Sequence, residues 1–472
     1  MFVEPPKDPW FLMGDYVAPP LGILTLAAYL EARLKKVEIE VVDCQAEKLD
    51  WNNLEKRIEN FKADIVIPSS LGTSNAFAVL ETVDLAKRVD PKIITLAGGQ
   101  HFTALADESL TKYSNLDIIV RGEGEQTLLE IVKALEESTA LSKINGISYR
   151  TQKRVAHTPN RPLLNDLDVL PYPGYHFVEK HVDDYHYELM GGKDSTFAIV
   201  EGARGCFHNC FYCSQWYFWG RCRRTKSPKR IADEIEELFD KYGFKLFWLA
   251  DDDFGLGERA EKLCDEIIDR DLQDSITWFL QARCDDIVQS KDVLGKMRKA
   301  GNIWILLGLD TPNAETGRVF RKNAVNHSDA KKAVDLLREN DIFSQATFII
   351  GEWRDSHDSI ETLRNYADWV NPDLATFMAL TPFPGTEVYD MAKKNGLIED
   401  PDWSNYDMVH AIMPTQFLTR QEVQKELHKC YREFFGSFKR ISQGILSKNP
   451  ITRRSYQYMF RKALLTSLEN LF

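Results

Sequence analysis

Long apolar segments are missing from this 472-residue sequence. No run of about 18 or more apolar residues occurs, so we expect no helix that spans a membrane. The N-terminus has no basic stretch followed by an apolar one, so no secretory signal peptide is expected. Eight cysteines are too few to hold a chain of this length in a disulfide framework. These absences favour a protein of the reducing cytoplasm.

Basic residues are fewer than acidic residues in this chain. The chain has 59 Lys and Arg against 71 Asp and Glu, a formal net charge of −12, whereas general nucleic-acid binding needs a basic surface. Nucleic acid is therefore not an expected partner. The net charge is unevenly distributed, because residues 435–472 carry +6 and the rest of the chain carries −18.

Short β-type runs alternate with helical patterns in the first part of the chain. Strands are expected at residues 37–44, 63–70, 92–99 and 116–122, with a short one at 1–3, and helices at 23–35 and 76–88. Alternation of this kind predicts an α/β domain with a doubly wound parallel sheet over residues 1–175. Ligands of such sheets bind beyond the carboxyl ends of the strands.

Four loops at the expected strand ends are rich in glycine, hydroxyl and amide groups. Such groups let the backbone approach a ligand and supply hydrogen bonds, although each loop alone could be a simple turn. The candidate ligand residues in these loops are Pro20, Leu21, Gly22, Ser69, Ser70, Leu71, Thr73, Gly98, Gly99, Gln100, His101, Gly122, Glu123, Gly124 and Glu125.

The ordered runs PPLGILTLAAYLE, SSLGTSN, GGQHFTAL and RGEGEQTLLEIV resemble the cobalamin-binding domain fused to many radical S-adenosylmethionine (SAM) enzymes. The resemblance implies that the four loops contact cobalamin. The second expected strand is followed by Asp43-Cys44-Gln45-Ala46, and the Asp-x-His-x-x-Gly run of the methionine-synthase type is missing. The resemblance therefore implies no histidine ligand to cobalt, with residues 69–75 passing beneath it.

Six further β-type runs follow a linker placed at residues 176–195. They lie at residues 197–202, 246–250, 276–282, 303–309, 345–351 and 374–380, with helices expected at 228–242, 260–270, 291–299 and 329–340. Six βα units predict a partial (β/α)6 barrel of the TIM type at residues 196–400, with its chemistry at the carboxyl ends of the strands. A helical region with the basic tail is expected at 401–472.

Three cysteines, Cys206, Cys210 and Cys213, lie in one loop directly after the first barrel strand. Thiolates hold iron–sulfur clusters, and three of them leave one iron of a [4Fe-4S] cluster open for substrate. The alternatives are a zinc site completed by His208 or Cys222, and buried thiols that only pack.

The C-x3-C-x2-C spacing resembles the radical SAM superfamily, which binds SAM at the open iron. The resemblance implies SAM contacts from side chains beside the cysteines and at the next strand ends, namely Tyr212, Asp251, Asp252, Arg283 and Asp310. The acids could instead cap the next helix, and Arg283 could form an ion pair at the barrel end. Gly351-Glu352-Trp353-Arg354 departs from the Gly-x-Pro-Gly of relatives.

By resemblance, the cluster cleaves SAM to a 5′-deoxyadenosyl radical that takes a hydrogen atom from an unactivated carbon. We predict methyl transfer to a hydrophobic small molecule or lipid, with an external electron donor of the flavodoxin or ferredoxin type. Oxidative ring formation, and a non-catalytic cobalamin or electron-transfer protein, are the alternatives. A methylthiotransferase is not expected, because only Cys44 precedes Cys206.

The basic tail also contains aromatic residues and leucines. Tyr456, Met459, Phe460 and Leu464 share one face of a helix, which favours peripheral contact with anionic membrane. The alternative is a helix docked on the barrel with its basic face in solvent.

Overall fold

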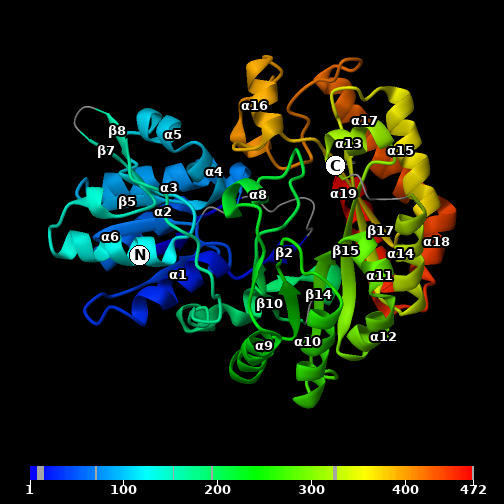
Figure 1. Ribbon diagram of the computed structural model, residues 1–472, viewed down its shortest axis with the longest axis horizontal. Coiled ribbons are helices and arrows are strands. Elements are labelled where there is room, and N and C mark those ends of the chain that lie inside the picture. The colour runs from blue at the N-terminus through cyan, green and yellow to red at the C-terminus, as the bar shows by residue number, and fades with distance from the viewer. Residues whose placement is uncertain (8–14, 70–71, 152–153, 193–194, 323–326, 470–472) are drawn as a thin grey trace.

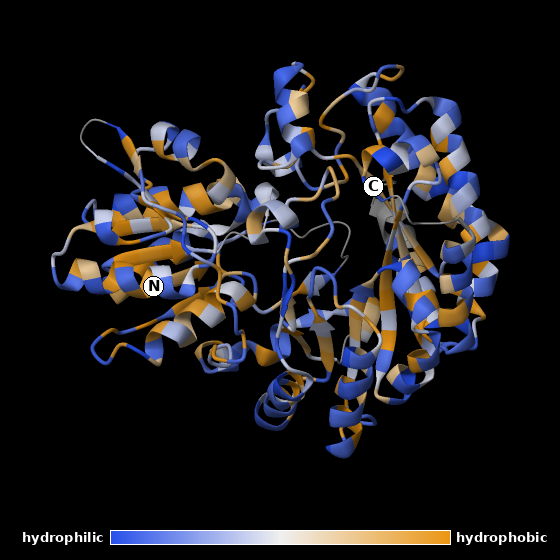
Figure 2. Ribbon diagram, viewed as in Figure 1, coloured by the Kyte–Doolittle hydropathy of each residue, from blue (hydrophilic) through white to orange (hydrophobic). Residues whose placement is uncertain are grey.

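A computed structural model describes residues 1–7, 15–69, 72–151, 154–192, 195–322 and 327–469. Two α/β units lie side by side, and helices of the C-terminal region surround the second unit (Figure 1). In both units the strands are the most apolar segments and the covering helices present mixed surfaces (Figure 2). No helix within the described ranges is long and apolar enough to cross a membrane.

The first unit contains a seven-stranded sheet in the order β3-β1-β4-β5-β6-β7-β8. Its first five strands in this order are parallel, as predicted: β1 (Phe2–Glu4), β3 (Val41–Asp43), β4 (Ile65–Pro68), β5 (Ile94–Ala97) and β6 (Ile118–Val120). The sequence analysis missed the antiparallel hairpin β7 (Ile147–Arg150) and β8 (Val155–His157), which extends the sheet beyond β6.

Helices cover both faces of this sheet, as in doubly wound folds. They are α1 (Leu21–Glu31), α2 (Trp51–Phe61), α3 (Ala76–Val89), α4 (Gly99–Ala104), α5 (Ala106–Lys112) and α6 (Glu125–Glu136). Leucines and isoleucines of α1 and α6 enter one hydrophobic core, and those of α2 enter another on the opposite side of β1. Because the helices cover the faces of the sheet, the strand ends that face the second unit are lined by loops.

The second unit is a partial barrel of six parallel strands in sequential order, as predicted. The strands are β10 (Phe197–Val200), β13 (Leu246–Leu249), β14 (Thr277–Ala282), β15 (Asn302–Asp310), β16 (Phe343–Ile350) and β17 (Leu374–Ala379). The helices between them are α9 (Pro228–Tyr242), α10 (Glu258–Asp269), α11 (Cys284–Gln289), α12 (Lys291–Lys299), α13 (Ala314–Val319), α14 (His327–Glu339) and α15 (His357–Val370).

Helix α9 illustrates why the barrel helices could be predicted closely. The Ser227 side chain accepts a hydrogen bond from the Arg230 amide, and Pro228 occupies the first turn, where its missing N–H costs nothing. Gly243 ends the helix with a left-handed φ of +75°. Start and stop signals of this kind are local, so the sequence alone indicates them.

The predicted linker is ordered in its described part. It contributes β9 (His186–Tyr187), which pairs antiparallel with β2 (Tyr16–Val17), and the short helix α7 (Glu188–Gly191). Tyr185 donates a hydrogen bond of 3.0 Å to the buried Asp43 carboxylate of the first unit. The two units are thus joined by packed contacts rather than by a free tether.

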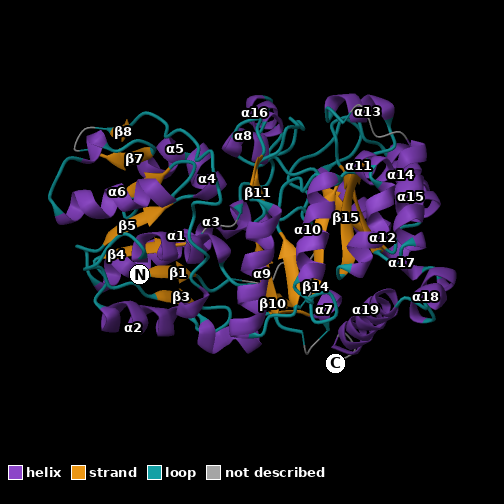
Figure 3. Ribbon diagram, turned by 60° about the horizontal axis from the view of Figure 1, so that its bottom comes forward, coloured by secondary structure: helices purple, strands orange, loops and turns teal. Residues whose placement is uncertain are grey.

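Four helices follow the last barrel strand: α16 (Glu387–Lys394), α17 (Arg420–Gly436), α18 (Phe438–Ile445) and α19 (Pro450–Glu469). Helix α19 lies across the amino-terminal end of the barrel beside α7 (Figure 3). Its Ile451 and Tyr458 join the core formed by the first residues of the barrel strands. Of the predicted apolar stripe, Tyr456 is buried, Met459 is half-buried, Phe460 is 48% exposed, and the Leu464 side chain lies outside the described residues.

Candidate functional site

The cysteine loop follows β10 and lies between the two strands of a short antiparallel pair, β11 (Ala203–Arg204) and β12 (Arg224–Thr225). Gly205 has a φ of +84°, and a side chain there would strike the Cys222 carbonyl, so only glycine fits at this turn. Its amide donates 3.1 Å to the Asp252 carboxylate. The Cys213 amide and the Trp216 indole both donate to the Cys210 carbonyl, which closes the loop.

The three cysteine sulfurs, as they stand, do not converge on a single metal ion. Three thiolates on a tetrahedral zinc would lie about 3.8 Å apart, given Zn–S bonds of about 2.3 Å. Cys206, Cys210 and Cys213 all belong to the described residues, and their sulfurs do not gather within 4.8 Å of one another. Burial raises the pKa of Cys206 to about 11, so the thiolate needs a bound metal to form near neutral pH.

A buried polar triad stands beside the cysteines and includes two of the predicted SAM residues. The Tyr212 hydroxyl donates 2.5 Å to Asp310 at the end of β15, and the Lys322 ammonium lies 2.6 Å from the same carboxylate oxygen. Lys322 also donates 3.1 Å to the Gly308 carbonyl. The sequence analysis missed Lys322, because a lysine after a short helix carries no local sign of burial.

Two of the remaining predicted SAM residues, Asp251 and Arg283, are already engaged by other groups of the protein. Asp251 is fully buried, accepts from the Gly202 and Ala203 amides at 2.7 and 2.8 Å, and pairs with Arg259. This is typical of a structural role at the end of β10. Arg283 donates two hydrogen bonds to the Asp285 carboxylate, so it forms the ion pair that was the alternative to a SAM contact.

Asp252 points from the same strand end toward the cysteine loop and is mostly buried. Burial raises its pKa to about 7. A carboxyl group that is neutral in part near neutral pH can either accept or donate a hydrogen bond, so Asp252 is the acid of this cluster best suited to contact a ligand.

Several predicted cobalamin loops leave open space at the sheet edge. A Cβ added at Gly22, Gly72 or Gly122 would meet no atom within 4 Å. Ser69 is half-buried directly after β4, and Pro20 and Leu21 begin α1. Ser70 and Leu71 lie outside the described residues. These open glycines fit a large ligand that needs close approach of the backbone.

His101 does not face this open space. It is buried beside Thr73, with its Nδ1 3.4 Å from the Thr73 hydroxyl, and its ring packs edge-on against Trp403. Burial lowers the pKa of His101 to about 4, so the ring stays neutral. The expectation that no histidine ligates cobalt stays a prediction.

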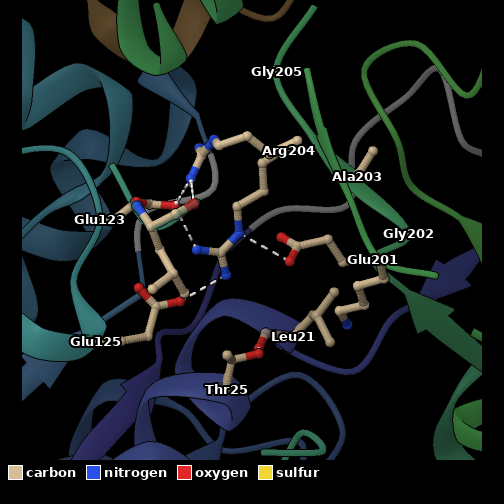
Figure 4. A network of polar contacts seen from close by, with 12 residues as sticks. Leu21, Thr25, Glu123, Glu125, Glu201, Gly202, Ala203, Arg204 and Gly205 are labelled. Atoms are coloured by element: carbon tan, nitrogen blue, oxygen red, sulfur yellow. Dashed lines mark hydrogen bonds and ion pairs between the residues drawn. The ribbon is translucent and has the colours of Figure 1, made fainter. Parts of the chain in front are cut away.

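Two predicted cobalamin residues instead bind the cysteine-loop unit. Arg204, two residues before Cys206, contacts Glu123 at 2.9 Å, Glu125 at 2.6 Å and Glu201 at 2.9 Å (Figure 4). Arg224 contacts the same Glu123 oxygen at 2.7 Å. Although burial raises the pKa of Glu125, the Arg204 charge outweighs it and holds that pKa below its usual value.

We name the set Glu123, Glu125, Glu201, Arg204 and Arg224 the interdomain ion-pair network. The sequence analysis placed Glu123 and Glu125 on cobalamin because they follow a strand end. In the structure their carboxylates are engaged by guanidinium groups, which compensates the cost of burying the charges. Sequence alone gave no sign of their partners, which lie about 80 to 100 positions along the chain.

Gln100 makes a second bridge between the units. Its carbonyl accepts 2.5 Å from Ser214, and its amide donates 2.6 Å to Gln215 at the start of α8 (Gln215–Trp219). Ser214 directly follows Cys213. The first turn of α4, directly after β5, therefore touches the cysteine loop of the second unit, which brings the two candidate cofactor sites to one interface.

In this chain, loops of a Rossmann-like sheet meet the cysteine loop of a six-stranded barrel. This combination defines a class of radical enzymes that use two cofactors. Two family models match these units: "B12 binding domain" over residues 14–132 and "Radical SAM superfamily" over residues 200–376. The two matches follow each other in the order of the two predicted domain types.

Relatives match over most of the chain. The anaerobic magnesium-protoporphyrin IX monomethyl ester cyclase of Rubrivivax gelatinosus is 32% identical over 456 residues, covering 95% of this chain and 79% of its own. That of Cereibacter sphaeroides is 32% identical, covering 86% and 66%. The hopanoid C-3 methylase of Methylococcus capsulatus is 24% identical, covering 88% and 77%.

Two solved structures share the fold. The cobalamin-dependent SAM radical enzyme OxsB, solved with aqua-cobalamin and SAM, has a TM-score of 0.73 at 18% identity and covers 98% of this chain and 70% of its own. TsrM from Kitasatospora setae, solved with cobalamin and a [4Fe-4S] cluster, has 0.67 at 17% identity and covers 85% and 76%.

The chain belongs to the cobalamin-binding radical SAM enzyme family. The predicted fold, domain types and cofactor set of [4Fe-4S] cluster, SAM and cobalamin are confirmed by these matches. The individual contact residues stay predictions.

Proposed function

We propose that this protein is a C-methyltransferase that uses a [4Fe-4S] cluster, SAM and cobalamin to methylate an unactivated carbon of a hydrophobic small molecule or lipid. The observation that carries the proposal is the direct contact between the cysteine loop and the cobalamin-type loops, at Gln100 and in the interdomain ion-pair network. When bound, the cofactors supply the radical and the methyl group.

The chain's own residues hold and orient these groups. Cys206, Cys210 and Cys213 would hold the cluster and leave one iron for the amino acid part of SAM. Tyr212 and Lys322 hold the Asp310 carboxylate beside the cysteine loop, and Asp252 accepts from the Gly205 amide at the start of that loop. The loops of Gly22, Gly72 and Gly122 leave room for cobalamin.

Relatives support both the reaction and the substrate class. The hopanoid C-3 methylase is named as methylating a lipid, and the cytidylyl-2-hydroxyethylphosphonate methyltransferase of Streptomyces wedmorensis is 24% identical over 437 residues. Both are named for methyl transfer. Because the two names give different substrates, they support methyl transfer but do not favour one particular substrate.

Oxidative ring formation is the second candidate. The 32% identity with the Rubrivivax cyclase over 95% of this chain exceeds the identity with the methyltransferases, which is the observation in its favour. A cyclase would use the same two cofactor sites, so the geometry described above accommodates either reaction.

Counting the products of SAM separates the two candidates. The full-length protein is reconstituted anaerobically with cluster and cobalamin, reduced, and given SAM alone. A methyltransferase should release S-adenosylhomocysteine in an amount equal to the bound cobalamin, even without substrate. A cyclase should release 5′-deoxyadenosine without S-adenosylhomocysteine, and that result would overturn methyl transfer.

Two partners belong to the same proposal. The cluster must be reduced before each cleavage of SAM, so we infer an external donor of the flavodoxin or ferredoxin type. We also infer peripheral membrane contact through the basic tail. Its support is α18, where Phe438 is 85% exposed beside Lys439 and the following Leu446 is 78% exposed.

A further inference from the structure

Three chemically different metal ligands meet beside the first cluster cysteine. The Cys206 sulfur, a ring nitrogen of His208 and a carboxylate oxygen of Asp253 all lie within 4.8 Å of one another. His208 lies within the cysteine motif but is not one of its thiols, and Asp253 comes from the segment after β13. The group therefore differs from the set of three cysteines that would hold the cluster.

One carboxylate oxygen of Asp253 has no hydrogen-bond partner. The side chain is 7% exposed, and its Oδ1 is buried without a hydrogen-bond partner. Its Oδ2 is held by the Arg223 guanidinium at 3.3 Å, which fixes the carboxylate in place. A buried carboxylate oxygen without a partner is costly, and a bound cation would remove that cost.

The charges around the group are mixed. The carboxylates of Asp252, Asp253, Asp285 and Asp286 lie among four cations, which are Arg223, Arg259, Arg283 and Lys322. The His208 amide lies 3.5 Å from the Cys206 sulfur, so the turn that carries both side chains is tight. The three ligand types and their spacing, rather than the net charge, therefore point to a metal.

We propose that Cys206, His208 and Asp253 form a mononuclear site for a divalent transition metal of the Zn²⁺ or Fe²⁺ class, which fills only when the cluster is not assembled. One sulfur, one imidazole nitrogen and one carboxylate oxygen suit such ions, with a fourth position for water. Tetrahedral bonds would place the ligand atoms about 3.3 to 3.8 Å apart, so each side chain moves inward by at most about 1 Å.

Binding has a direct consequence for cluster assembly. The metal replaces the proton of the Cys206 thiol and occupies a sulfur that the cluster requires. Zinc bound here therefore excludes the cluster, and the chain has two mutually exclusive metal states. This inference does not depend on which reaction the enzyme catalyses.

The test uses the full-length protein prepared without cluster or cobalamin and titrated anaerobically with Zn²⁺. X-ray absorption at the zinc edge should show a single sulfur ligand, with nitrogen or oxygen in the remaining positions. The Cys210→Ser/Cys213→Ser double variant should keep this zinc, although it cannot hold the cluster. His208→Gln and Asp253→Asn should each weaken zinc binding by at least about tenfold, since loss of even an outer partner of a metal ligand costs about that much.

Asp285→Asn is the matched control, because it removes a nearby carboxylate that is not in the group. Thermal melting without metal establishes that each variant is folded. Zinc added before reconstitution should suppress cluster formation in the wild type and not in His208→Gln. Three sulfur ligands in the wild type, or loss of zinc from the double cysteine variant, would overturn the proposal, and the wild-type spectrum decides even if Asp253→Asn fails to fold.

Discussion

Replacing Arg204 by methionine should strongly destabilise the junction between the two units. The Arg204 side chain is 6% exposed. Among the described residues, its guanidinium forms the ion pair with Glu125, whose side chain is 10% exposed. Glu123 would keep Arg224 at 2.7 Å, and Glu201 is exposed enough to be hydrated in part. The main cost is therefore one buried carboxylate without a cation, and breaking such a pair costs about 3 to 5 kcal/mol.

Urea unfolding followed by tryptophan fluorescence measures this loss. The ring of Trp219, one of ten tryptophans, lies 5.6 Å from the Arg204 guanidinium, so the difference between proteins with and without Trp219→Phe reports on this junction. Lys226→Met is the matched control. It breaks the Lys226–Glu234 pair, equally buried but contained within the barrel unit. Both variants should lose similar stability, whereas only Arg204→Met should shift this difference signal before global unfolding.

A second substitution separates the charge from the packing. The double variant Arg204→Met/Glu125→Met removes both members of the pair and should recover most of the lost stability, since well-packed apolar residues replace buried ion pairs at little cost. A loss below about 1 kcal/mol in Arg204→Met would show that the network is not buried as described. A double variant as unstable as the single one would also refute the reasoning.

Three further predictions concern the cluster, the first unit and the tail. Replacing all three cluster cysteines by alanine should abolish iron–sulfur absorbance and SAM cleavage, and a variant that kept both would remove the assignment. Burial lowers the pKa of His101 from 6.5 to about 4, so its contribution to stability is fully present above pH 6.5 and is lost as the pH falls toward 4. Urea unfolding should therefore show wild type losing about 2 kcal/mol more than His101→Gln between pH about 7 and about 5, and equal losses would contradict the burial of His101. Phe438→Ser/Leu446→Ser should reduce salt-sensitive co-sedimentation with anionic liposomes without changing the melting temperature, and unchanged binding would exclude α18 as the contact.

Elements whose signals are local could be predicted from the sequence. The six barrel strands and α9 have continuous apolar runs and clear capping residues, so their order and positions were expected. The β7–β8 hairpin was missed because its strands are short and polar on one side, and pairing with β6 is what stabilises them.

Partners distant in sequence could not be predicted. Asp251 and Glu125 were correctly placed at strand ends, but whether such an acid faces a ligand or a buried arginine depends on long-range packing. The tail shows the same limit. Its pattern favoured a helix, yet only the fold shows that Tyr458 covers the amino-terminal end of the barrel.

We propose that the cluster and cobalamin bind at the interface where Gln100 and Arg204 join the two units. Electron paramagnetic resonance of the full-length protein, reconstituted with Co(II) cobalamin and a reduced [4Fe-4S] cluster, tests it most directly. We expect a spectrum that is split or broadened by interaction between the two spins. A spectrum equal to the sum of the two centres measured separately would contradict it.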